Sequence, residues 1–149
     1  MTKGEAIIAA VIAKITGVGG LEAVFDSTVR EQARDKVLYA VVSEGDEGAN
    51  VPAGQRISPL SMRTQITVGV VAAGGDTTDT TFAAITRLRA AQEAIEGVLL
   101  KSDITFAGLV RQFIYTGAIN TARGEGEQVS IVREMRFDAL WDYDLPDEA

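Results

Sequence analysis

The stretch 60-LSMRTQITVGV-70, together with the residues that follow at 79–100, decides the fold. In the first part apolar and polar residues alternate, and the apolar set is Leu60, Met62, Ile66, Val68 and Val70. That period of two is typical of a strand with one buried face. In the second part the apolar residues recur at helical spacing, at Phe82, Ile85, Leu88, Ala91, Ile95, Val98 and Leu99. A half-buried strand followed by an amphipathic helix predicts a helix that lies on a sheet.

The segment before this stretch predicts a second helix and two more strands. Residues 2–5 have capping-box spacing and lead into an apolar helical stripe that stops at Gly17. Ala23–Phe25 is a short apolar strand candidate, and the residues 29–33 are compatible with one helical turn. The residues Val37–Val42 have the composition of a buried strand.

The segment after the long helix predicts a hairpin of two strands. Gly108–Ile119 and Glu127–Tyr143 are both strand-like, and Asn120–Gly126 joins them through glycines. Arg133 interrupts the apolar row of the last strand, so we expect it near a rim of the sheet. The whole order predicts an α+β fold, with a largely antiparallel sheet of four to five strands and two helices packed on one face.

Length and composition are those of one folded unit. The chain has 149 residues, 46% of them hydrophobic and 23% charged, so we expect residues 1–141 to form a single α+β domain. The residues 142–149 predict an acidic C-terminal tail, because Pro146 cannot continue a strand ladder. No apolar run reaches the roughly 20 residues of a membrane span, so no membrane partner is expected.

The residue types present disfavour catalysis. There is no cysteine and no histidine, which excludes thiol chemistry and the commonest general base and metal ligand. Carboxylate pairs such as Glu31 with Asp35 lie in no apolar setting that would separate their pKa values. We therefore expect no enzyme, no catalytic residue and no cofactor. The net charge of −7 also disfavours general nucleic-acid binding.

An acidic stretch interrupts the strand pattern. Glu44–Ser58 is rich in glycine and charge, which predicts a long loop of the kind that is functional or disordered. Its carboxylates Glu44, Asp46 and Glu47 are of the ligand type that calcium prefers, but the alternating ligands and closing glutamate of an EF-hand are missing. We favour a solvated loop over a metal site.

Several stretches, taken in order, carry a likeness to a known family. They are the opening helix with Val24–Asp26, the segments Val29–Ala33, Leu38–Gly45 and Gln65–Val71, the helix from Asp79, and the closing strand Val132–Trp141. In this order they resemble the tail-terminator and tail-completion proteins of tailed bacteriophages, which are small α+β proteins at the neck of the virion.

The resemblance implies a structural protein that caps or terminates the tail tube and joins it to the head. It implies a homo-oligomeric ring, commonly a hexamer, located in the virion tail or neck and assembled in the host cytoplasm. The implied partners are further copies of the chain, the tail tube protein and a head or neck connector. DNA passes through such a ring without specific binding, which suits an acidic protein. The alternatives are another neck or minor tail component, such as a head–tail joining protein, and a small regulatory or ligand-binding α+β module.

Family members make contacts through loops and sheet edges, so the resemblance indicates Glu44–Ser58 and Asn120–Glu127 as contact segments. The candidate interface residues are Glu44, Asp46, Glu47, Arg56, Arg123 and Glu125. Arg56 and Arg123 are the expected ion-pair donors among them. The alternative interpretation of both segments is ordinary solvated loops.

Overall fold

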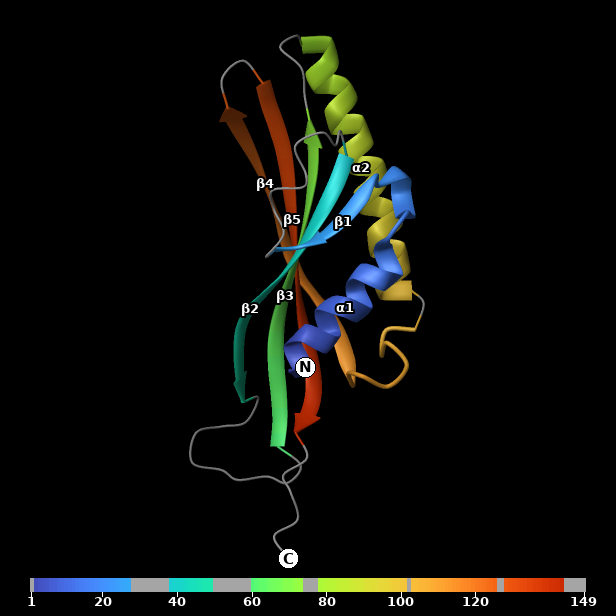
Figure 1. Ribbon diagram of the computed structural model, residues 1–149, viewed down its shortest axis with the longest axis vertical. Helices are drawn as coiled ribbons and strands as arrows, with labels where there is room; N and C mark the ends of the chain where they lie inside the picture. Colours follow the sequence, from blue (N-terminus) through green and yellow to red (C-terminus); the bar gives the residue numbers. More distant parts are fainter. Residues whose placement is uncertain are drawn as a thin grey trace, which may run out of the picture.

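The computed structural model describes residues 2–27, 38–49, 60–73, 78–101, 103–125 and 128–143. The elements follow in the order α1 (Lys3–Ile15), the 3-10 turn η1 (Val18–Gly20), β1 (Ala23–Asp26), β2 (Leu38–Ala49), β3 (Leu60–Ala73), α2 (Thr78–Lys101), β4 (Gln112–Glu125) and β5 (Gln128–Tyr143). The strands form one five-stranded sheet in the order β1-β2-β3-β5-β4 (Figure 1). β1 is parallel to β2, and the other neighbours are antiparallel. The predicted α+β class is confirmed.

β3 is the centre of the sheet, as the alternation of its residues predicts. It pairs with β2 on one side and with β5 on the other. Its inward residues Ile66, Val68 and Val70 are fully buried. Across the β3–β5 ladder they meet a second apolar row, because Ile66 lies opposite Phe137 and Val68 opposite Met135. The two rows form the sheet side of the hydrophobic core.

Both helices pack on the face of the sheet that these rows form. The Thr2 side chain and the Glu5 carboxylate make a capping box at the start of α1, as the sequence predicts. α1 then buries Ile7, Val11 and Ile15, and α2 buries a stripe that includes Ile95 and Leu99. All of these residues belong to one hydrophobic core with β2, β3 and β5. In Figure 1 the two helices lie together on one side of the sheet.

Two segments that the sequence predicts as loops are strands. Glu44–Ala49 continues β2, with Glu44 opposite Ile66 and Glu47 opposite Thr64. The rest of Glu44–Ser58 lies outside the described residues, as does the predicted helical turn at 29–33. The segment from Asn120 to Glu125 continues β4 and pairs with β5. Ladder bonds to a neighbouring strand outweigh the low strand propensity of glycine and acidic residues.

The strand predicted from Gly108 begins later, at Gln112. Before it, the Asp103 carboxylate accepts hydrogen bonds from the Thr105 hydroxyl and from the Ala107 backbone N–H, each at 2.9 Å. These bonds close a turn in which Phe106 and Ala107 have positive φ angles of 50° and 59°, outside the strand region. The ring of Phe106 anchors the turn in the core, edge-on to Phe113 at 5.0 Å.

The last strand runs to Tyr143, so it includes two residues that the sequence assigns to the acidic tail. Tyr143 lies opposite Leu60 at the start of β3. Asp142 pairs with Arg111, with 3.3 Å between carboxylate oxygen and guanidinium nitrogen. The residues 144–149 lie outside the described part of the chain.

Candidate interaction surface

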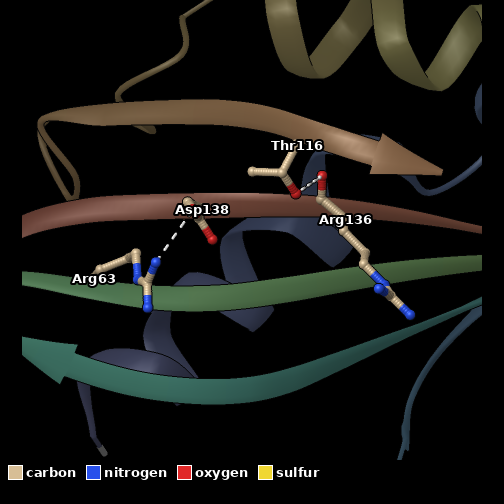
Figure 2. A network of polar contacts seen from close by, with 4 residues as sticks. All are labelled: Arg63, Thr116, Arg136 and Asp138. Carbon is tan, nitrogen blue, oxygen red and sulfur yellow. Dashed lines mark hydrogen bonds and ion pairs between the residues drawn. The ribbon is translucent and has the colours of Figure 1, made fainter.

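The face of the sheet opposite the helices carries polar side chains between apolar ones. Along β3 and β5 the residues that alternate with the core point to this open face, among them Arg63, Gln65, Thr67, Glu134, Arg136 and Asp138. Figure 2 looks onto the open face, with α1 behind the sheet. We call this layer the open face. Together with the two edges of the sheet it is the candidate surface for partners.

Polar contacts tie the strands together on the open face. Arg63 on β3 pairs with Asp138 on β5 at 3.9 Å, and the Thr116 hydroxyl on β4 donates to the Arg136 backbone carbonyl at 3.0 Å (Figure 2). Thr116 lies where the β4 register shifts between Tyr115 and Gly117. A bulge disrupts the ladder locally, and the hydroxyl supplies a hydrogen bond there. The Arg63–Asp138 pair is solvent-accessible, so it adds little stability.

Among the described residues, both edges of the sheet have backbone without a strand partner. Within the described part of the chain β4 pairs only with β5, and the side chains of Ile114 and Ile119 on β4 are 43% and 44% exposed. At the other edge β1 pairs only with Tyr39–Val42 of β2, so Ser43–Ala49 has no outer neighbour among the described residues. Unpaired edges can pair with another chain unless charge or a bulge protects them. The β2 edge has both kinds of protection. It carries the carboxylates of Glu44, Asp46 and Glu47, and its register shifts between Glu44 and Glu47.

We call the carboxylates of Glu5, Glu44, Asp46 and Glu47 the acidic rim. All four residues are exposed. Glu47 accepts a hydrogen bond from the buried Thr64 hydroxyl at 3.1 Å. The Glu44 carboxylate lies over the backbone of α1, where a Cβ on Gly4 would collide with it. Within the described ranges no lysine or arginine forms an ion pair with the rim. Partial burial raises the pKa of Glu44, and the charges of Glu47 and Glu5 raise this pKa further.

We expect Glu44→Gln to increase the free energy of unfolding near neutral pH. A pKa raised by folding means that the folded state disfavours the charged carboxylate, so the cost is present above the folded pKa. It disappears as the pH falls through that value, and the two proteins should then converge. Urea melts at neutral and acidic pH measure this difference, with Glu93→Gln on exposed helix surface as the control. A variant less stable than the wild type at neutral pH would contradict this description of the rim.

The predicted interface residues fall into two separate groups. Glu44, Asp46 and Glu47 lie together on β2, level with Thr64 to Ile66 of β3. Arg123 and Glu125 lie in β4 beside the hairpin end, opposite Ser130 and Gln128. Ser130 is level with Ala73, at the far end of β3 from the rim. The fold therefore does not bring the two groups together within one chain. Arg56 lies outside the described residues.

Sequence reasoning did not find the exposed isoleucines of β4 or the partner of Arg133. Arg133 lies on the helix side of β5, and its guanidinium donates to the Asn120 side chain at 2.9 Å. The interruption of the apolar row marks Arg133 in the sequence. Its partner cannot be predicted from the sequence, because it depends on the β4–β5 register, in which Asn120 lies opposite Arg133.

Two further features are absent from the described residues. These residues contain no group of three or more acidic side chains arranged to hold a metal ion. Among their helices none is both long and apolar enough to span a membrane.

Comparison with known proteins shows a likeness of fold. No protein-family model and no curated protein matches the sequence. Among solved structures, a chain of the structure titled "Virion of native gene transfer agent (GTA) particle" superposes with a TM-score of 0.52 at 17% identity. The match covers 89% of this chain and 85% of that chain. This protein therefore shares its fold with a chain of the gene transfer agent virion.

Proposed function

We propose that this chain is a structural, non-enzymatic protein of a tailed-phage-like virion, which terminates the tail tube and joins it to the head. The observation that carries the proposal is the fold shared with a chain of the gene transfer agent virion, over most of both chains. In this proposal the residues 1–141 act as one domain. The protein works as a closed ring of identical subunits, a hexamer, in the tail or neck of a virion assembled in the host cytoplasm.

The two edges of the sheet support a ring. A ring closes through head-to-tail contacts, which need two different surfaces on every subunit. One edge carries the acidic rim, and the other carries Ile114 and Ile119 on β4. The two surfaces differ in chemistry and lie on opposite sides of the subunit, as a head-to-tail contact requires.

The charge of the chain supports a lumen through which DNA moves. A net charge of −7 repels phosphate, so a ring of such subunits would let DNA pass without binding it. The partners along the ring axis are the tail tube protein on one side and a head or neck connector on the other. Glu44–Ser58 and Asn120–Glu127 are the proposed contact segments, with Arg56 and Arg123 as ion-pair donors.

We expect Arg56→Glu combined with Arg123→Glu to reduce attachment to tube ends while the monomer stays folded. Surface charges contribute only about 0–1 kcal/mol to stability, whereas reversed charges in an interface repel their partners. Electron microscopy of tubes assembled from tail tube protein, mixed with each variant, counts the capped ends. Arg87→Glu with Lys101→Glu makes the same charge change on exposed surface of α2 and is the control. Unchanged capping by the Arg56 and Arg123 variant would contradict the assignment of these segments.

The shared fold supports equally a second candidate, a head–tail joining protein, because the likeness is to a virion and not to a position in it. The same micrographs separate the two. A tail terminator attaches to tube ends, and a joining protein attaches to purified head connectors.

A further inference from the structure

A cleft of about 450 Å³ lies between α2 and the hairpin half of β4 and β5. Its apolar wall consists of Ile85 and Leu88 from α2 and Ile131 from β5. Its polar groups include Arg89 from α2 and Arg133 from β5. The described residues that line the cleft therefore combine an apolar surface with two guanidinium groups, and no carboxylate is among them.

The two arginines have capacity for an acidic ligand. One Arg133 nitrogen donates to the Asn120 side chain at 2.9 Å, but its Nε is buried and has no hydrogen-bond partner in the described structure. Arg89 is exposed and forms no ion pair with any described residue. A buried N–H without an acceptor is unfavourable, and guanidinium groups bind carboxylates through paired hydrogen bonds. These features favour a carboxylate-bearing segment as the occupant.

The acidic rim of the same chain cannot reach this cleft. Glu44 lies opposite Ile66, which lies opposite Phe137, and Arg133 is four residues further along β5. The rim and Arg133 are therefore about 13 Å apart along the strands and about 10 Å apart across them. In a second copy of the chain that lies beside the β4 edge, the rim could reach the cleft, because the two belong to different subunits.

The rim has the properties of a complementary occupant. The charges of Glu47 and Glu5 repel the Glu44 carboxylate, and no ion pair within the described residues neutralises the rim. The register shift between Glu44 and Glu47 places the exposed Asp46 at a bulge, on a part of β2 that has no outer neighbour among the described residues. The bulge on one subunit edge carries negative charge, and the cleft beside the opposite edge carries two guanidinium groups, so the two are complementary in charge.

We infer that the cleft between α2 and the β4–β5 hairpin receives the acidic rim of a second copy of this chain. Arg89 and Arg133 pair with rim carboxylates, and the apolar wall excludes water from these pairs. The inference rests on the proposed ring and deepens it, because it assigns the lateral contact between subunits. In a closed ring every subunit would place its rim in the cleft of one neighbour and receive the rim of the other neighbour in its own cleft.

Charge exchange tests the contact. Arg89→Glu and Asp46→Lys each place like charges together, so each should weaken self-association at least tenfold. The combined variant keeps the wild-type net charge of −7 and exchanges the two charges, so positions 46 and 89 again carry opposite signs. It should associate within about threefold of the wild type on the same affinity scale. Sedimentation velocity over a concentration series measures association, and circular dichroism checks the fold.

Two further variants separate the contact from general effects. Arg87→Glu changes the charge on α2 outside the cleft and should associate like the wild type. Arg133→Gln keeps a side chain that can bond to Asn120 but removes the charge and the buried Nε. It should weaken association at least threefold, and Asp46→Lys should not rescue it.

Each outcome decides between hypotheses. If the wild type forms rings and Arg89→Glu does not reduce their formation, this inference is wrong and the ring proposal is unaffected. The same conclusion follows if the combined variant stays monomeric. If removal of residues 144–149 abolishes rings while Asp46→Lys leaves association unchanged, the acidic segment 144–149 occupies the cleft. The rim is then not the occupant. A wild-type protein that never associates, alone or with tube protein, contradicts the proposed function as well.

Discussion

Phe137→Ala is expected to lower the free energy of unfolding by about 3–5 kcal/mol, the range for truncating a buried aromatic ring. Phe137 is fully buried at the centre of the core. Its ring stacks on Phe113 with centroids 4.7 Å apart and meets the Tyr115 ring edge-on at 5.5 Å. The substitution removes buried apolar surface, opens a cavity between β3, β4 and β5, and breaks both aromatic contacts. Urea melts of the two proteins measure the loss.

Ile114→Ala is the matched control for this substitution. Ile114 lies on β4 next to Phe113, but its side chain is 43% exposed on the open face. Its truncation should change the stability of the monomer by no more than about 0.5 kcal/mol. Equal losses for Phe137→Ala and Ile114→Ala would mean that the two faces of the hairpin are assigned wrongly.

Leu99→Ala and Ile95→Ala are each expected to cost about 2–5 kcal/mol, through lost burial and a residual cavity. Both side chains are fully buried on the face of α2 that packs on the sheet. They are one helical turn apart, so their effects in a double variant should not add. The measurement is again denaturant unfolding. Val98→Ala, at a half-buried neighbouring position, should cost less. A loss below about 0.5 kcal/mol for either core variant would mean that another face of α2 is buried.

The central strand and the long helix could be predicted because their patterns are local. Alternation over 60–70 indicates one buried face whichever strands lie beside it, and β3 extends this pattern to Ala73. Helical spacing over 79–100 likewise indicates a helix with one apolar stripe, and α2 spans Thr78–Lys101. The capping box at Thr2 is also local, and the structure contains both of its hydrogen bonds.

Features set by distant partners could not be predicted in the same way. The acidic and glycine-containing residues of Glu44–Ala49 have low strand propensity, and they are a strand because β3 supplies a ladder. The late start of β4 results from a turn that the Asp103 carboxylate closes and Phe106 anchors. Asp103 and Thr105 have a turn-forming pattern, but nothing nearby in the sequence shows that Phe106 is anchored in the core.

In the candidate surface, too, residue types could be predicted from the sequence but their positions in the fold could not. The charge of Glu44, Asp46 and Glu47 is visible in the sequence, whereas their position on a free edge depends on how little of β2 is paired with β1. The resemblance groups them with Arg123, and the register places Arg123 near the other end of the sheet. The cleft beside Arg133 exists only once α2 crosses the hairpin, so residue types alone could not indicate it.

The molar mass of the purified wild-type protein tests the central claim most directly. Light scattering coupled to size-exclusion chromatography, over a concentration series with and without tail tube protein, gives this mass. The proposal predicts one closed species at six times the 15.8 kDa of the chain, seen as rings in electron micrographs of the same fraction. A single species at 15.8 kDa at every concentration, unchanged when tubes are added, would contradict it.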